Sequence, residues 1–187
     1  MESATCRGRQ LAGQMGGRIM AKSSAARGVV FVHSTPKALC QHVEWAIGGI
    51  LGSSVNLDWV DQPVAPGTVR AELSWTGAPD LSAKITSALR IFPNLRFEIT
   101  EEPSPGFDGQ RFVSTPTLGL WRSPMGVFGE GFISEEKLRA AMIAAVTQGN
   151  SLVEVVDEVL GGAWDRELEP FRYAGDGVPV RWLHQVG

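Results

Sequence analysis

Two spacings of apolar residues alternate along the first half of the chain and predict two helices among four strands. Apolar residues three and four apart indicate amphipathic helices, whereas alternation of apolar and polar residues indicates half-buried strands. A short β-branched run at Val29–Val32 predicts a buried strand. In chain order, the predicted elements are a strand at 29–32, a helix at 36–51, strands at 55–60 and 69–75, a helix at 81–92 and a strand at 95–99.

Capping residues set the expected ends of the two helices. Thr35 can cap the first helix with Pro36 at its first position, and Gly52 ends it. Asp80 offers a cap for the second helix, which Pro93 terminates. We therefore expect both helices to begin at a side-chain cap.

The order β-α-β-β-α-β over residues 28–101 is that of the split βαβ, ferredoxin-like unit. A right-handed crossover places its first and third strands at the centre of the sheet, with both helices on one face. The strand alternation fits, because apolar side chains fall on the helix-covered face and polar ones on the other. The apolar set is Val55, Leu57, Trp59, Val69, Ala71, Leu73, Trp75, Leu95, Phe97 and Ile99, and the polar set is Asn56, Asp58, Arg70, Glu72, Arg96 and Glu98.

The first strand departs from this alternation. Val29 and Phe31 are apolar on one side, and Val30 and Val32 are apolar on the other. We therefore expect another part of the chain to cover the back of this strand. The C-terminal third is the only material available to do so.

The beginning of that third predicts an extension of the sheet. A turn at Phe107–Gly109 leads into a strand at 111–113, which we place beside the fourth strand as a hairpin. Segments 118–121 and 127–133 are interpreted as a second hairpin or as two extended segments, with frequent glycine.

Two helices follow. Ser134 caps the first, which ends before Gly149, and a capping box of Ser151 and Glu154 begins the second, which ends at Gly161. The expected buried face of the first consists of Leu138, Met142, Ala145 and Val146. The predicted fold class is therefore α+β, with an antiparallel ferredoxin-like core extended by a β-hairpin and two C-terminal helices.

Composition supports one folded domain. The chain has 187 residues, of which 43% are hydrophobic and 20% are charged. Residues 1–27 are rich in Gly, Ala, Ser and Arg, so we expect a disordered extension there, with Met20 as an alternative start. We expect residues 28–187 to form a single domain, with the core at 28–101 and an extension packed on it at 102–187.

Charge, hydropathy and cysteine content exclude several classes of protein. Residues 28–187 carry twelve positive and nineteen negative charges, and an acidic surface of this kind excludes nucleic acid as a partner. No apolar stretch approaches the roughly 18 residues of a membrane span. Two cysteines, Cys6 and Cys40, do not make a disulfide framework or a zinc site, so we expect no metal, no cofactor and a reducing cytoplasm.

The first candidate site lies at the expected start of the first helix. His33 and Ser34, with the amides of the first helical turn, could hold a carboxylate or phosphate, or Ser34 could be a simple cap. Within the helix, Cys40 and Glu44 share a face whereas His42 points away, so the three cannot jointly bind a metal. An enzyme would instead pair His33 with Cys40, or His42 with Glu44, as acid, base or nucleophile.

The second candidate surface lies in the C-terminal tail. Trp164, Arg172 and Trp182 are candidates for a protein interface, because aromatic residues and arginine are enriched at such surfaces. The alternative is that the tail aromatics close the back of the sheet. Arg181 and His184 are polar groups that could join His33 around a small ligand.

Three stretches of this sequence resemble a known family. These are Val29–Trp45 (VVFVHSTPKALCQHVEW), Thr115–Trp121 (TPTLGLW) and Trp164–Gly187. They resemble the actinobacterial domain-of-unknown-function family DUF3145, over residues 28–187. The resemblance implies a bacterial, cytoplasmic protein and assigns no activity or functional residue.

Two functions remain open. The first is a non-enzymatic regulatory or protein-interaction module, with an unknown protein partner or self-association. The alternative is a small-molecule-binding protein or enzyme with a site near His33. A concave pocket that joins His33 to a polar group of the tail would favour the alternative.

Overall fold

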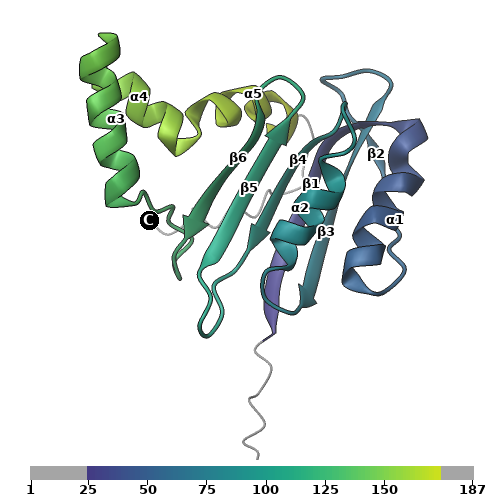
Figure 1. The fold of residues 1–187 in the computed structure, drawn as a ribbon. Coiled ribbons are helices and arrows are strands. Elements are labelled where there is room, and N and C mark those ends of the chain that lie inside the picture. The colour runs from purple at the N-terminus through teal and green to yellow at the C-terminus, as the bar shows by residue number, and fades with distance from the viewer. Residues whose placement is uncertain (1–24, 174–187) are drawn as a thin grey trace, which may run out of the picture.

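The structure is a computed structural model that describes residues 25–173 and consists of one antiparallel sheet with helices on both of its faces (Figure 1). Six strands form the sheet in the order β2-β3-β1-β4-β5-β6. The strands are β1 (Ala26–Pro36), β2 (Val60–Asp61), β3 (Thr68–Gly77), β4 (Arg96–Glu101), β5 (Gly109–Thr115) and β6 (Gly119–Met125). The α-helices are α1 (Cys40–Leu51), α2 (Leu81–Leu89), α3 (Glu135–Gln148), α4 (Leu152–Leu160) and α5 (Gly162–Tyr173).

Strand register divides the side chains between the two faces of the sheet. Val30 lies opposite Leu73 of β3 and Ile99 of β4, and all three face α1 and α2. The next residue, Phe31, lies opposite Glu72 and Glu98 on the other face. The predicted assignment of apolar and polar positions in β3 and β4 is therefore confirmed, as is the adjacency of β1 and β3.

The main core lies between α1, α2 and the sheet. Its buried members come from β1, β3, β4, β5, both helices and the segment before β2. They include Val30, Val32, Val43, Ile47, Leu57, Trp75, Ile85, Leu89, Phe97, Ile99 and Phe112. Trp75 is 5% exposed, so its expected position under the helices is correct.

The predicted start of the first helix is wrong. Thr35 is a fully buried residue of β1 that pairs with Val69 of β3, and Pro36 pairs with Thr68. Continued pairing with β3 thus carries the strand past the expected cap. A 3₁₀ turn, Lys37–Leu39, follows, and α1 begins only at Cys40.

The second predicted strand is also wrong over most of its length. Only Val60–Asp61 forms β2, because the residues before it bond to a helix instead of a strand. The backbone amide of Leu57 and the indole of Trp59 both donate to the Glu44 carboxylate of α1, each at 2.9 Å. The alternation at 55–59 therefore belongs to a loop that packs its apolar side chains on the core.

The cap of α2 differs from the expected one. Asp80 adopts a left-handed conformation with φ of 70° and makes no side-chain cap. Glu101, at the end of β4, accepts hydrogen bonds from the Asp80 amide at 2.7 Å and the Ser82 amide at 2.9 Å. A carboxylate from the sheet thus satisfies the free amides at the helix start.

The C-terminal third confirms the hairpin and two of its helices. β5 pairs with β4 and then with β6, whereas residues 127–133 form no strand and make one isolated bridge, between Gly131 and Met125. Ser134 caps α3, and the Ser151–Glu154 capping box begins α4. The helix ends at Gly149 and Gly161 are also as expected.

Two features of this region were not expected. The buried face of α3 is made by Ala141 and Ala145, while Leu138, Met142 and Val146 are 42%, 52% and 84% exposed. A third C-terminal helix, α5, follows α4 and contains Pro170, a residue that normally argues against a helix. The helix accommodates it one turn from its C-terminal end.

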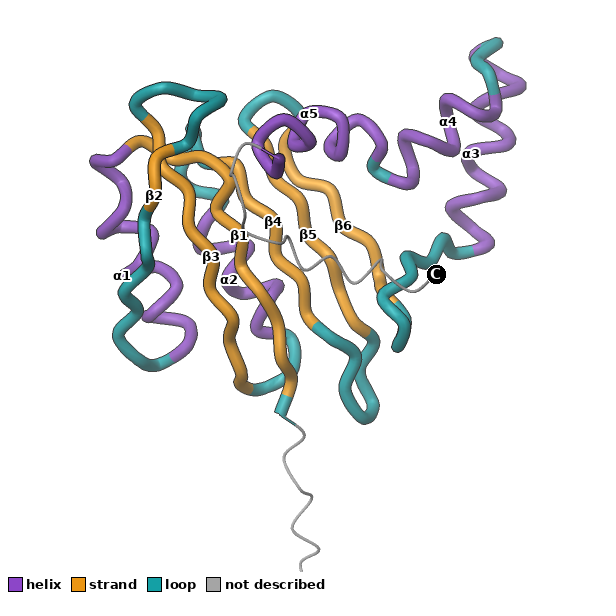
Figure 2. The backbone as a smooth tube through the Cα atoms, turned by 180° about the vertical axis from the view of Figure 1, so that it is seen from behind, coloured by secondary structure: helices purple, strands orange, loops and turns teal. Residues whose placement is uncertain are grey.

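Helix α5 lies across the face of the sheet opposite α1 and α2, where it contacts β1 and β5 (Figure 2). The expectation that C-terminal material covers the back of β1 is therefore correct for the end of the strand that contains His33. The α3–α4 pair stands beyond the β6 edge. β1 begins at Ala26, two residues before the expected domain boundary, and the rest of the predicted N-terminal extension lies outside the described residues.

Candidate functional site

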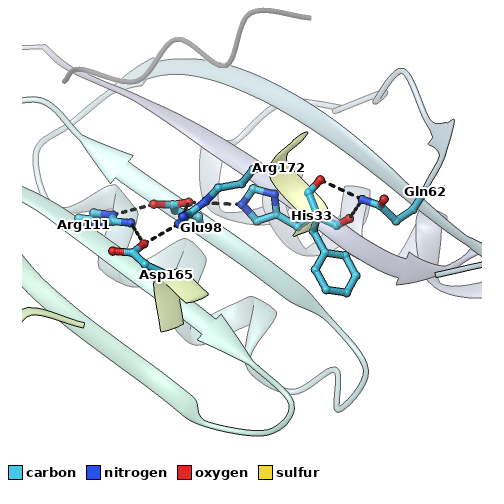
Figure 3. Close-up of polar contacts among 7 residues, drawn as sticks. His33, Gln62, Glu98, Arg111, Asp165 and Arg172 are labelled. Atoms are coloured by element: carbon cyan, nitrogen blue, oxygen red, sulfur yellow. Dashed lines mark hydrogen bonds and ion pairs between the residues drawn. The ribbon is translucent and has the colours of Figure 1, made fainter. Parts of the chain in front are cut away.

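Five charged or titratable side chains meet between α5 and the sheet, and we call them the Glu98 cluster (Figure 3). Glu98 Oε2 lies 3.3 Å from His33 Nε2 and 3.0 Å from Arg172 Nη2, and Glu98 Oε1 lies 2.6 Å from Arg111 Nε. Asp165 Oδ1 then joins the two arginines, at 2.6 Å from Arg111 Nη2 and 2.8 Å from Arg172 Nη2. Two carboxylates are thus matched by two guanidinium groups.

Strand alternation and helix periodicity bring this cluster together. His33 ends the part of β1 that lies beside Phe97 and Glu98, at an irregularity in the register between Val32 and Ser34. Asp165 and Arg172 are seven residues apart on α5, so they share the face that meets the sheet. The cluster therefore connects three strands to the last helix.

Glu98 is ionised despite its burial. Its side chain has no exposed surface, and burial alone would raise its pKa. The hydrogen bond with His33 and the positive charges of Arg111 and Arg172 outweigh that effect and lower the pKa to about 2. Glu98 in turn raises the pKa of Arg111 against the opposing effect of burial.

This arrangement anchors the helix and is poorly suited to proton transfer. A carboxyl group with a pKa of about 2 is deprotonated at neutral pH and cannot serve as a general acid. Both of its oxygens already accept charged hydrogen bonds and are shielded from solvent. The chemistry of the Glu98 cluster is therefore electrostatic.

Gln62 makes a second connection beside the cluster. Its Nε2 donates to the His33 carbonyl at 2.7 Å and to the Phe171 carbonyl at 3.3 Å (Figure 3). Its Oε1 accepts from the Val64 amide at 3.2 Å. This side chain is 1% exposed. It ties the end of β1 to the loop after β2 and to the last turn of α5.

A pocket of about 340 Å³ opens next to the cluster, and we call it the β1–α5 pocket. Its lining combines two aromatic rings with charged groups from β1, β3 and α5. The lining residues are Phe31, Val32, His33, Asp58, Val60, Arg70, Ala71, Glu72, Phe171 and Arg172. This volume lies at the lower end of the range for small-molecule sites.

Fixed aromatic groups form two walls of this pocket. Phe31 stacks on His33 with ring centroids 6.0 Å apart and an interplanar angle of 10°. Phe171 lies under the Arg96 guanidinium, whose Cζ is 4.8 Å from the ring centroid. The Phe31 ring is thus held by a residue of its own strand, and the Phe171 ring by an arginine of β4.

A second depression, of about 480 Å³, is lined by residues of α5, by Asp157 of α4 and by Arg111 of β5, and it is more open. Its charged groups pair with one another: Arg166 contacts Asp157 at 2.8 Å, and Arg172 contacts Asp165. We therefore regard the β1–α5 pocket, with its aromatic walls, as the better ligand site.

The structure places only part of the predicted site in this pocket. His33 lies in it, but on the face of the sheet away from α1 and not at a helix start. Ser34 donates to the Thr68 hydroxyl at 3.4 Å, so neither residue caps a helix. The structure therefore shows no anion site made by His33 with the first turn of α1.

The other candidates in the first helix lie apart from His33. Cys40 begins α1, on the opposite face of the sheet, and burial together with nearby Glu44 raises the pKa of its thiol. His42 is exposed and packs edge-on against Trp45, whereas Glu44 holds the loop before β2. His42 and Glu44 therefore do not form an acid–base pair.

The tail candidates fall into two groups. Trp164 packs against Trp121 with centroids 6.5 Å apart and donates to the Gly119 carbonyl at 3.0 Å. Arg172 belongs to the Glu98 cluster and has a 9% exposed side chain, which leaves little of it for a protein interface. The remaining candidates, Arg181, Trp182 and His184, lie outside the described residues.

Sequence reasoning missed Glu98 and Arg111 as members of the site. Two signals were available: Glu98 lies on the polar face of a central strand, and the apolar back of β1 predicts that this face is covered. A covered carboxylate requires cationic partners, because burying an unpaired charge is costly. The sequence alone does not identify which arginines supply them.

The fold and the pocket define an α+β protein with a ligand-sized cavity between its sheet and its last helix. The family model described as Protein of unknown function (DUF3145) matches residues 29–185, so the chain belongs to this family, as the resemblance indicated. Comparisons with curated proteins and with solved structures found no match.

Two further features of the structure bear on the kind of site. Within residues 25–173, no group of three or more His, Cys, Asp or Glu side chains is arranged to hold a metal ion. In the same part of the chain, no helix is both long enough and apolar enough to cross a membrane.

Proposed function

We propose that the protein binds a small organic molecule in the β1–α5 pocket and acts as a non-enzymatic, ligand-responsive module. The observation that carries this proposal is that the pocket joins His33 to Phe171 and Arg172 of the C-terminal helix. A concavity with apolar walls and a few convergent polar groups is the usual form of a small-molecule site.

Binding is favoured over catalysis by the state of the reactive groups. Glu98 is ionised and fully paired, and the Cys40 thiol has a raised pKa on the other side of the sheet. Neither group is therefore suited to act as acid, base or nucleophile on a molecule in the pocket.

Native mass spectrometry of the protein, purified gently from its own host without added ligand, tests this proposal. We expect a retained small molecule in the wild type and in Tyr173→Ala, and its loss in Phe171→Ala. Both changes remove an aromatic ring from the same turn of α5, but only Phe171 lines the pocket. Circular dichroism checks that each variant is folded.

A wild type that carries no small molecule, and that takes up none from a metabolite extract of the host, would overturn the proposal. Retention by a folded Phe171→Ala variant at the wild-type level would do the same.

The first four strands and two helices are best described as a ferredoxin-like unit. The sheet order β4-β1-β3-β2 within this part, with α1 and α2 on one face, supports that description. Such units are used for ligand sensing and for dimerisation, which is an argument from analogy. We also infer a cytoplasmic location in an actinobacterium, on the basis of the family resemblance and the two cysteines in the sequence.

A second candidate function is self-association through α3 and α4, which extends the prediction of an interaction module. No residue of α4 is buried among the described residues, and several large apolar side chains of α3 and α4 are exposed. Their exposures are 42% for Leu138, 52% for Met142, 84% for Val146, 47% for Leu152, 77% for Val153 and 49% for Leu160. Contiguous apolar surface of this kind commonly marks an interface.

The partner that best fits this surface is a second copy of the chain. Leu138, Met142 and Val146 are spaced four residues apart, so an antiparallel α3 pair centred on Met142 places Leu138 of each copy opposite Val146 of the other. α3 carries two acidic and two basic side chains, so two copies do not repel each other. Such an interface requires about 800 Å² from each protomer, which the two helices together could supply.

Sedimentation velocity over a hundredfold range of concentration tests this candidate function. We expect a concentration-dependent dimer in the wild type and in Ile91→Glu, and a monomer in Met142→Glu, where two like charges would meet at the axis. Ile91 is a matched control, because it is 72% exposed in the turn after α2. A wild type that remains monomeric throughout would contradict self-association.

A further inference from the structure

Arg70 is the arginine of the β1–α5 pocket whose charge the described residues leave unmatched. It lies on β3, on the same face as Glu72, and lines the pocket. Among residues 25–173, its buried Nε atom has no hydrogen-bond partner, and no carboxylate lies within 4.0 Å as an ion-pair partner. By contrast, Arg172 on the opposite wall bonds to both Glu98 and Asp165.

A guanidinium that lines a pocket and has no carboxylate partner can pair with an oxyanion that enters from outside. The planar guanidinium presents its donors as a fork that matches an oxyanion with two coplanar oxygens. Arg70 is therefore the natural position for the anionic end of a ligand.

The rest of the lining defines the body of that ligand. Phe31 and Phe171 provide aromatic walls and Val60 adds an aliphatic side chain at the open edge of the sheet. Within about 340 Å³, this lining fits a small apolar or aromatic skeleton.

A carboxylate in the pocket lining decides between two kinds of anion. Asp58 also lines the pocket, so a doubly charged phosphate would meet a negative side chain there. A singly charged carboxylate makes the same pair of hydrogen bonds with Arg70 and is repelled less than a phosphate.

We propose that the ligand of the β1–α5 pocket is a small organic monocarboxylate, with its carboxylate on Arg70 and its apolar body between Phe31 and Phe171. This inference rests on the proposed function, because it names the class of molecule that the same pocket binds.

Isothermal titration calorimetry with matched probes tests the inference. The probes are 2-naphthoate, its neutral amide 2-naphthamide, and 2-naphthyl phosphate, which share one aromatic skeleton. We expect the wild type to bind 2-naphthoate at least tenfold more tightly than the other two. Arg70→Gln should remove the preference for 2-naphthoate over the amide, while Arg70→Lys should retain part of it. Arg90→Gln, at an exposed arginine beyond α2, should behave as the wild type.

The outcomes separate this inference from the proposed function. Binding of naphthoate and naphthamide with equal affinity, lost in Phe171→Ala, would overturn the carboxylate assignment and leave a ligand pocket in place. Tighter binding of the phosphate, or an unchanged preference in Arg70→Gln, would also overturn it. Binding of no probe by the wild type, up to the solubility limit, would count against both proposals.

Discussion

At the scale of single residues, Glu98 is the carboxylate that joins the sheet to α5 beside the pocket. It is a fully buried carboxylate with three cationic or hydrogen-bonding partners, from β1, β5 and α5. A buried ion pair adds little net stability compared with apolar packing, but removal of one partner leaves the others without compensation. The network therefore makes the position of α5 depend on one side chain of β4.

We expect Glu98→Gln to lower the free energy of unfolding by about 3–5 kcal/mol, because it leaves Arg111 and Arg172 facing each other without their shared carboxylate. Urea denaturation at pH 7 measures this loss. Glu102→Gln makes the same substitution at an exposed position four residues along the chain and should change stability by less than about 0.5 kcal/mol. Equal losses of stability in the two variants would contradict the role of Glu98 as the shared carboxylate of the Glu98 cluster.

The pKa of Glu98 also predicts how stability depends on pH. Its pKa is about 2 when folded, against an ordinary value of 4.5, so the unfolded chain takes up the proton first as the pH falls. The contribution of ionised Glu98 to the free energy of unfolding is therefore complete above about pH 4.5 and is lost as the pH falls towards 2. It amounts to about 3 kcal/mol for a shift of this size. The difference in the free energy of unfolding between the wild type and Glu98→Gln should therefore become smaller as the pH falls through this range. A difference that stays constant would refute the low pKa.

Gly28 provides a test of packing in the main core. A Cβ at this position of β1 would overlap the Thr100 carbonyl and the Trp75 indole, so we expect Gly28→Ala to destabilise the fold by about 1–3 kcal/mol. Gly49 of α1 is the control, because a Cβ there meets nothing within 4 Å, and Gly49→Ala should stabilise the fold by about 0.5–1 kcal/mol. Thermal unfolding of both variants checks these opposite signs.

At the scale of elements, α5 is held on the sheet by polar contacts as much as by apolar ones. Glu167 accepts from Arg96 at 3.3 Å and from the Thr115 hydroxyl at 2.9 Å, and Leu168 is fully buried. The helix supplies two residues of the pocket lining, Phe171 and Arg172. Docking of this one element therefore creates the site.

We expect Leu168→Ala to cost about 2–5 kcal/mol and to act first on α5. Amide hydrogen exchange should show faster exchange in α5, with the amides of α1 and α2 protected as in the wild type. Glu169→Ala, at the neighbouring exposed position, should leave α5 protected. A uniform loss of protection in Leu168→Ala would mean that α5 does not form a separate unit.

The elements that could be predicted from the sequence are those whose patterns are local. The periodicity of α1 and the alternation of β3 are complete within their own residues, and the Ser134 and Ser151 caps act on amides three residues away. The predictions that are wrong concern long-range contacts. Thr35 belongs to β1 because it pairs with Val69. The start of α2 is capped by the carboxylate of Glu101, twenty-one residues from Asp80 in the sequence, and not by the Asp80 side chain.

The site shows the same limit. His33 was a candidate because it follows a buried strand, and it does line the pocket, although it lies on a different face of the sheet from the expected one. Arg111 and Asp165 come from elements far apart in the chain, so only the docking of α5 brings them together. Residues 164–173 were placed in the C-terminal tail and not in a helix, and Pro170 is a residue that argues against a helix.

At the scale of the whole molecule, the sheet separates an apolar core from a polar second face. α1 and α2 lie on one side of the sheet and α5 covers part of the other (Figure 2). The first two helices bury the aliphatic side chains, and the β1–α5 pocket lies beside α5. A ligand that contacts both the sheet and α5 would stabilise the docked position of the helix. Binding and helix docking are thus coupled, which gives the proposed module a way to respond to its ligand.

The most direct test of this account is an amide NMR spectrum of the uniformly ¹⁵N-labelled protein titrated with 2-naphthoate. The account predicts saturable shifts that are concentrated at His33, Arg70, Glu72 and Phe171, with the α3–α4 amides unchanged. Shifts confined to α3 and α4, or no saturable shift at any amide, would contradict the assignment of the pocket as the ligand site.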